Sequence, residues 1–230
     1  MFTGSIVNAL AIVAGGALGL LLKSGIPERF NKTLMQALGL SVFLIGLQGA
    51  LGMKGEDTLL VIFSLIIGGC LGEWINIEQR LEDFGNRVQA RFSKLGGSFS
   101  KGFVTTSLIY CVGSMAIMGA LQGGLEGKHD ILFAKALLDG VLSVVFASTL
   151  GLGVLASSVP VLLYQGGIAL GASLLKPFLV PGVVAQMSVT GGLLIAAIGI
   201  NILDIIKVKV GNLLPAVFVP LVWYVVQGLF

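Results

Sequence analysis

Charged side chains are scarce in this sequence: Lys, Arg, Asp and Glu make up 11% of its 230 residues, whereas hydrophobic residues make up 56%. A soluble domain carries roughly 25% charged residues, so this chain lacks the polar surface that water would require. Its apolar runs are continuous and lack the alternation of barrel strands. We therefore expect an all-α integral membrane protein with the lipid bilayer as a partner. The net charge of +3 does not indicate nucleic-acid binding, because the basic residues lie between the apolar runs.

Residues that support hydrolytic or metal chemistry are equally rare. The chain has one histidine, His129, and two cysteines, Cys70 and Cys111, without metal-type spacing. Hydrolysis inside a membrane needs paired aspartates, a Ser/His pair or a zinc-binding His-Glu-x-x-His motif. No Gly-Lys-Ser/Thr follows the glycine-rich stretches, so they do not resemble phosphate-binding loops. We expect no enzymatic activity and no cofactor, and the sequence leaves open whether a metal is bound.

Eight apolar runs are long enough to cross a membrane. They are Ser5–Leu22, Leu34–Gly52, Thr58–Trp74, Phe103–Gln122, Phe133–Leu155, Pro160–Leu175, Val183–Leu203 and Leu213–Phe230. The fifth and sixth runs are separated only by residues 156–159. Most lysines and arginines lie in the odd-numbered loops, which places these loops in the cytoplasm and both termini outside.

The third loop has a periodic pattern of its own. Apolar residues recur every three or four positions, with charged residues between them: Ile77, Leu81, Phe84, Val88, Phe92 and Leu95. This pattern predicts an amphipathic helix over about 76–97 that lies at the cytoplasmic interface. Two roles stay open for it, an anchor beside anionic headgroups or a helix that gates the protein or docks a partner.

The chain also repeats itself. Residues 39–48 align without gaps on residues 192–201, so that both glycines and the closing amide, Gln48 or Asn201, coincide. Spans one to three thus resemble spans six to eight, and the odd offset of five helices means that the copies cross the membrane in opposite directions. Many secondary transporters contain such inverted repeats, although duplication without transport gives the same pattern. Gly-x-x-x-Gly elements, among them Gly15/Gly19, predict closely packed helices.

These features predict a single transmembrane domain over residues 1–230. Its parts are a first repeat at about 1–74, the interfacial helix at about 76–97, central spans at about 103–155 and a second repeat at about 158–230.

One span carries two charged residues. Lys135 and Asp139 are spaced i,i+4 and share one helix face, which Ser143 continues one turn further. A carboxylate in hydrocarbon is costly, so Asp139 is expected to face a protein interior or a water cavity and to have a partner. The predicted binding residues are Asp139 as acceptor for a cation or proton, Lys135 as its resting counter-ion, Ser143, and the amides Asn8, Gln48, Gln165 and Asn201. A structural Lys–Asp bridge with interhelical hydrogen bonds is the competing interpretation.

Three blocks carry a resemblance to a known family. They are residues 100–119, Lys135-Ala-Leu-Leu-Asp139-Gly140 and Pro160-Val-Leu-Leu-Tyr164-Gln165-Gly166. They resemble the signature blocks of the bacterial YqgA/YdfK-like family of polytopic membrane proteins (domain of unknown function 554), and the resemblance covers essentially the whole chain. It implies the bacterial inner membrane but no mechanism. Residues 138–148 are also similar to the Asp-containing helices of manganese exporters in the lysine-exporter superfamily, whose paired acidic helix is missing here.

We expect a secondary transporter for a small solute or ion, coupled to a proton or cation through Asp139. The alternative is a non-transporting scaffold or sensor that acts through the amphipathic helix. Replacing Asp139 with Asn discriminates between them, because a transporter would lose its function and a scaffold would keep it. Substrate, direction and coupling ion stay open, and the sequence is compatible with a homo-oligomer.

Overall fold

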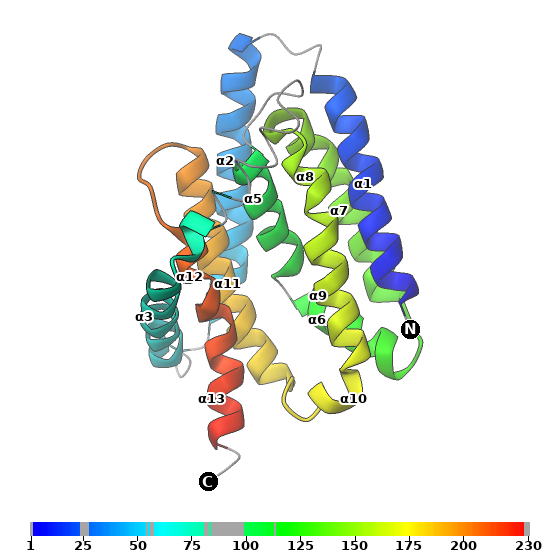
Figure 1. Cartoon of the computed structure of the whole chain (residues 1–230), viewed down its shortest axis with the longest axis vertical. Coiled ribbons are helices and arrows are strands. Elements are labelled where there is room, and N and C mark those ends of the chain that lie inside the picture. The colour runs from blue at the N-terminus through cyan, green and yellow to red at the C-terminus, as the bar shows by residue number, and fades with distance from the viewer. Residues whose placement is uncertain are drawn as a thin grey trace. The chain divides into compact units, whose positions relative to one another are not determined.

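The computed structural model describes residues 2–23, 28–53, 55, 58–80, 83, 99–112 and 114–227. The regular structure in these ranges is helical (Figure 1). Seven helical stretches are long and apolar enough to cross a membrane, and an eighth is obtained when one bent helix pair counts as a span. The prediction of an all-α membrane protein with about eight spans is confirmed.

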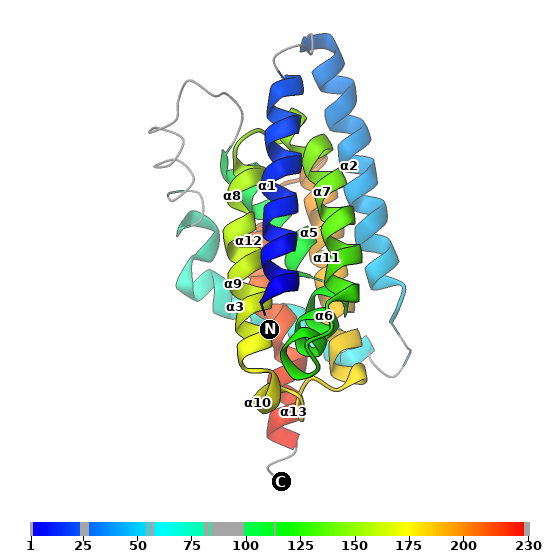
Figure 2. The same cartoon turned by 90° about the vertical axis from the view of Figure 1, so that its right-hand side faces the viewer.

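The chain forms two compact units, of which the first contains Met1–Met35, Glu82–Cys111 and Met115–Leu174. Its helices are α1 (Thr3–Lys23), α5 (Phe99–Cys111), most of α6 (Ser114–Leu125), α7 (Asp130–Leu150), α8 (Gly153–Ala156), α9 (Ser158–Leu170) and most of α10 (Ala172–Leu175). Helix α1 packs against both α7 and α9 and lies between them in Figure 2. At Gly15 a Cβ atom would overlap the carbonyl group of Gly140, so the absent side chain lets α1 approach α7 closely. The predicted close packing at Gly15 is confirmed.

The fourth predicted span is bent. Helices α5 and α6 meet at an angle of 60° instead of forming one straight helix over Phe103–Gln122. Tyr110 lies in the last turn of α5, immediately before this bend. Interrupted helices in membrane proteins occur where the freed backbone is covered by protein or lines a water-filled cavity.

The boundary between the fifth and sixth spans differs from the prediction. Helix α7 ends at Leu150, and Gly151 turns the chain with a φ of 80°. The next candidate span begins at Gly153 and includes Ser157, which the sequence had indicated as part of the connection. The hydroxyl of Ser157 donates to the carbonyl of Val154 at 2.6 Å. The predicted boundary was wrong because serines are typical of loops, but a serine hydroxyl that bonds to the backbone of the preceding turn can be buried without contact to water.

The second unit contains Gln36–Leu81, Val112–Ser114 and Leu175–Phe230. Its helices are the larger part of α2 (Glu28–Ala50), α3 (Thr58–Ile75), α11 (Pro181–Ile202), α12 (Val210–Leu213), the 3-10 helix η3 (Leu214–Phe218) and α13 (Val219–Gln227). Helix α11 is the most buried of the candidate spans.

Helices α2 and α11 pack antiparallel through glycines at equivalent places of the two aligned segments. A Cβ at Gly46 would lie 2.6 Å from Ala196 Cα, and one at Gly199 would lie 2.7 Å from Phe43 Cα. Shifting the residue numbers by 153, the offset between residues 39 and 192, turns the first contact into the second. The contact is therefore reciprocal, as it is where two-fold symmetry relates two surfaces. Two further pairs obey the same relation, Gly39–Leu203 and Gly192–Ala50.

The predicted amphipathic helix lies mostly outside the described residues. Residues 77–80 are helical and follow Asn76, which has a φ of 55°. Of the remainder, only Asp83 is described, so the helix over about 76–97 stays a prediction. The predicted repeat boundaries also stay predictions.

Candidate intramembrane binding site

Helix α7 presents a polar face to the protein and an apolar face outward. Lys135, Asp139 and Ser143 lie at successive turns and are 7%, 3% and 0% exposed. Leu137 and Val141, which lie between them in sequence, are 71% and 60% exposed. This is the reverse of a soluble amphipathic helix and is the arrangement expected where lipid covers the outer face.

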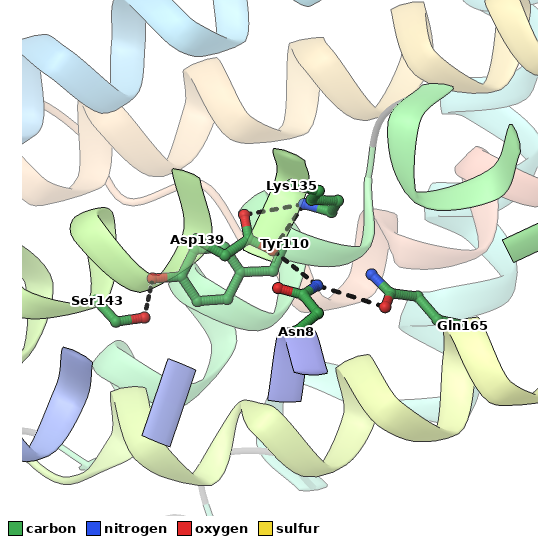
Figure 3. Close-up of polar contacts among 6 residues, drawn as sticks. All are labelled: Asn8, Tyr110, Lys135, Asp139, Ser143 and Gln165. Carbon is green, nitrogen blue, oxygen red and sulfur yellow. Dashed lines mark hydrogen bonds and ion pairs between the residues drawn. The ribbon is translucent and has the colours of Figure 1, made fainter. Parts of the chain in front are cut away.

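Lys135 and Asp139 form a closed ion pair. The ammonium Nζ of Lys135 lies 2.8 Å from Oδ2 and 2.9 Å from Oδ1 of Asp139, so it contacts both carboxylate oxygens (Figure 3). The same Nζ lies 5.9 Å from the centre of the Tyr110 ring. Opposite charges attract far more strongly in a low-dielectric interior than in water. The predicted pairing of Asp139 with Lys135 is present in the structure.

Two amides from other helices complete the cluster. Asn8 on α1 donates through Nδ2 to Asp139 Oδ2 at 3.0 Å and to Gln165 Oε1 on α9 at 3.4 Å (Figure 3). Both amide side chains belong to residues that are 0% exposed. Asn8, Lys135, Asp139 and Gln165, which we call the Asp139 cluster, thus tie three helices of the first unit together.

The carboxylate determines how the two amides are oriented. An ionised Asp139 only accepts hydrogen bonds, so Asn8 must turn its NH₂ group toward it. That group also donates to Gln165, which must therefore present its oxygen to Asn8. Asn8 Oδ1 and Gln165 Nε2 are the atoms left over, and both are buried without a hydrogen-bond partner in the described structure.

These two atoms make the cluster incomplete. A buried donor or acceptor without a partner costs about 1–3 kcal/mol, and most such groups in proteins are paired. Two hydroxyl oxygens share the condition, Ser5 Oγ one turn before Asn8 and Ser107 Oγ one turn before Tyr110. The atoms left over in the cluster are thus one acceptor, Asn8 Oδ1, and one donor, Gln165 Nε2. Within the described ranges, no group of three or more His, Cys, Asp and Glu residues is placed to hold a metal ion.

Tyr110 was not predicted from the sequence. Its hydroxyl lies 2.8 Å from Ser143 Oγ (Figure 3). Its ring centre lies 6.4 Å from that of Phe146. Tyr110 is completely buried. It lies in an apolar run, where an aromatic residue is read as core, but a buried tyrosine needs a partner for its hydroxyl. The need of a buried tyrosine hydroxyl for a partner is the feature from which a polar contact of Tyr110 could have been predicted.

Comparison with known proteins identifies relatives over nearly the whole chain. The family model described as "Protein of unknown function (DUF554)" matches residues 3–225. The chain belongs to this family. The resemblance seen in the sequence is thereby confirmed.

Two members of the DUF554 family illustrate the match. The chain is 35% identical over 220 residues to the "Uncharacterized membrane protein YdfK" of Bacillus subtilis (strain 168), covering 94% of this chain and 93% of that protein. It is 32% identical over 221 residues to the "Uncharacterized protein YqgA" of Escherichia coli (strain K12), again covering 94% and 93%. No solved structure matches the chain significantly.

The two remaining predicted site residues of this DUF554 protein, Gln48 and Asn201, belong to the second unit. Gln48 is exposed. Asn201 donates to the carbonyl of Val208 and accepts from its N–H, both at 2.8 Å. Its amide therefore closes the turn after α11, in which Asp204 has a φ of 59°. Binding roles for Gln48 and Asn201 stay predictions.

A second polar group joins the ends of α3 and α12 within the second unit. Glu73 accepts from Lys209 Nζ at 2.8 Å and from Asn212 Nδ2 at 2.5 Å, and Asn212 Oδ1 accepts from the backbone N–H of Glu78 at 2.7 Å. The donated hydrogen bond to Glu73 raises the pKa of Lys209 above its ordinary value. Both carboxylate oxygens of Glu73 have partners, so we interpret this group as a structural clasp.

Proposed function

We propose that this protein is a secondary transporter for a small solute or ion, and that the Asp139 cluster is its binding and coupling site. One observation carries the proposal: among the described residues, Asn8 Oδ1 and Gln165 Nε2 have no hydrogen-bond partner, although both are buried beside an ion pair. A purely structural tie between helices gains nothing from two unpaired groups, each of which costs about 1–3 kcal/mol. A binding site, in contrast, has unpaired polar groups whenever its ligand is absent.

Two features of the fold support transport. The bend between α5 and α6 directly follows Tyr110, which contacts Ser143 one turn from Asp139. Substrate sites of secondary transporters are commonly built beside such interrupted helices. The reciprocal contact between α2 and α11 is what an inverted repeat would produce, and inverted repeats underlie alternating access in several transporter folds.

In this mechanism Lys135 is the resting counter-ion of Asp139. A proton or cation that reaches the carboxylate competes with the ammonium, so binding at Asp139 loosens the ion pair that links two turns of α7. Because Asn8 bonds to the same carboxylate, a change at Asp139 reaches α1 and, through Gln165, α9. Coupling thus has a contiguous physical route through three helices.

The setting we propose is the bacterial plasma membrane, with the basic odd-numbered loops in the cytoplasm and both termini outside. The apolar helices and the membrane protein YdfK among the relatives support a membrane location.

The test uses purified protein reconstituted into liposomes that contain a pH indicator. Sodium, manganese, amino acids and small organic acids are added one at a time to wild type and to Asp139→Asn. We expect at least one solute to change the internal pH in wild type and not in Asp139→Asn. Ser157→Ala is the matched control, because it removes a completely buried hydroxyl that bonds within its own helix.

The outcome separates the transporter from a scaffold. Equal responses of wild type and Asp139→Asn, or no response of wild type to any solute of the panel, would contradict proton coupling through Asp139. A thermal-shift screen with the same solutes supplies the binding side, because a ligand of the folded state raises its melting temperature by linkage.

A further inference from the structure

Besides Asn8 Nδ2 and Gln165 Oε1, which bond to each other, the Asp139 cluster contains two hydrogen-bond acceptors and two donors. The acceptors are the Asp139 carboxylate, with formal charge −1, and the unpaired Asn8 Oδ1. The donors are the Lys135 ammonium, with formal charge +1, and the unpaired Gln165 Nε2. The cluster therefore pairs one charged and one neutral acceptor with one charged and one neutral donor.

The charges of the cluster cancel. An added lone cation would leave one positive charge without a partner, and an added lone anion would leave one negative charge. Uncompensated charge is costly inside a membrane, where neither water nor ions screen it. A solute that carries both charges adds no net charge, because its ammonium replaces Lys135 at Asp139 while its carboxylate replaces Asp139 at Lys135.

An uncharged amide would satisfy only part of the site. It could bond to Asn8 Oδ1 and Gln165 Nε2, but it would leave the ion pair of Lys135 and Asp139 closed, as it is in the structure. Such a solute would have no means of opening the pair. A solute with an N–H-bearing ammonium and a carboxylate engages all four groups.

We propose that the Asp139 cluster binds a small zwitterion with a free ammonium group and a carboxylate, of the α-amino acid class. Its ammonium donates to Asp139 and Asn8 Oδ1, and its carboxylate accepts from Lys135 and Gln165 Nε2. The four residues are between 0% and 7% exposed, so protein would enclose the bound solute. This assignment rests on the proposed function, in that it names the substrate class of the same site.

The test compares a zwitterion with its separate halves. Purified full-length protein in detergent is titrated with L-alanine, with ethylamine as its cationic half, with propionate as its anionic half and with propionamide as the neutral analogue. A second comparison uses glycine and glycine betaine, whose ammonium group lacks N–H donors. Melting temperature and calorimetric affinity are measured for each. We expect alanine and glycine to bind at least ten-fold more tightly than either half, the amide or the betaine.

A change of specificity guards against variants that merely unfold. Gln165→Glu is nearly isosteric, replaces the unpaired donor with an acceptor and adds a negative charge. We expect alanine binding to weaken at least ten-fold and ethylamine binding to strengthen in this variant. Ser157→Ala, in the neighbouring α8–α9 stretch, should leave both affinities unchanged.

The results distinguish this inference from the proposed function. If ethylamine or a metal cation alone binds wild type more tightly than alanine, and Asp139→Asn abolishes that binding, the zwitterion is wrong and the coupled transporter stands. If alanine binds as expected but moves no protons and crosses no liposome membrane, the site assignment stands and transport is wrong. Unchanged alanine binding in Gln165→Glu would overturn the assignment of the carboxylate to Gln165 Nε2.

Discussion

Removing one partner of the Lys135–Asp139 pair is expected to destabilise the protein far more than removing both. Lys135→Met leaves the Asp139 carboxylate, in a residue 3% exposed, with Asn8 as its one donor among the described residues, which costs about 3–5 kcal/mol of unfolding free energy. Asp139→Asn leaves the buried ammonium facing neutral groups, the new amide oxygen and the Tyr110 ring at 5.9 Å, so a loss toward the lower end of the same range is expected. In the double variant no charge is buried, and stability should return to within about 2 kcal/mol of wild type. The coupling energy of this cycle is the quantity to measure, by reversible unfolding in bicelles followed by circular dichroism.

The exposed pair of Lys209 and Glu73 is the control. Its Nζ–Oε1 distance is also 2.8 Å, but its side chains are 64% and 58% exposed, compared with 9% and 4% for Lys135 and Asp139. Water screens the exposed charges, so its coupling should be small beside that of the buried pair. A buried coupling below about 1 kcal/mol, the size of ordinary intramembrane hydrogen bonds, would refute the reasoning. A stable double variant also yields a folded protein whose Asp139 cluster carries no charge, in which loss of transport can be measured separately from loss of structure.

Three further results are expected from the same unfolding assay. Gly46→Ala should lower the unfolding free energy by about 1–3 kcal/mol, because the new Cβ would lie 2.6 Å from a backbone atom of α11. Gly167→Ala, which has open space around it, should raise the unfolding free energy by up to about 1 kcal/mol. Equal effects of the two variants would contradict the close α2–α11 contact. Asn201→Ala removes two hydrogen bonds to the turn after α11 and should cost about 1–3 kcal/mol, and a neutral result would show that water replaces them. The hydrogen bond to Glu73 raises the pKa of Lys209, so the stability that this pair contributes should persist up to pH 10.5, the ordinary lysine value, and be lost above it. The measurement is a pH series of the unfolding free energy for wild type and Lys209→Gln, and a difference between the two that stays constant with pH would contradict the reasoning.

Local periodicity made part of the site predictable. Lys135, Asp139 and Ser143 share a face because residues four apart do so in any α-helix, and the cost of a charge in hydrocarbon required that face to be inward. For Asn8 and Gln165 the sequence predicted a binding role and left interhelical hydrogen bonds as the competing interpretation. It did not predict that the two amides would bond to each other and that Asn8 would bond to Asp139, because that depends on how α1, α7 and α9 pack.

Other features depend on contacts that no local pattern encodes. Tyr110 contacts Ser143 across 33 positions of sequence, and nothing in its own neighbourhood distinguishes it from a core aromatic. The end of α7 follows from the positive φ of Gly151, one glycine among 34 in the chain. Residues 39–48 and 192–201, which align in the sequence, contact each other reciprocally in α2 and α11, but Asn201 uses its amide on a neighbouring turn.

The cancellation of charge within the Asp139 cluster has a consequence for the electrical behaviour of the protein. One elementary charge that crosses a membrane does work of about 2.3 kcal/mol per 100 mV. Lys135 and Asp139 lie one helical turn apart and carry opposite charges, so a rearrangement that moves both together displaces no net charge through the field. In the transport cycle proposed above, the empty cluster could then reorient at any membrane voltage, and so could a cluster that carries a zwitterion. Only a proton or cation that travels with the solute would make the cycle sensitive to voltage.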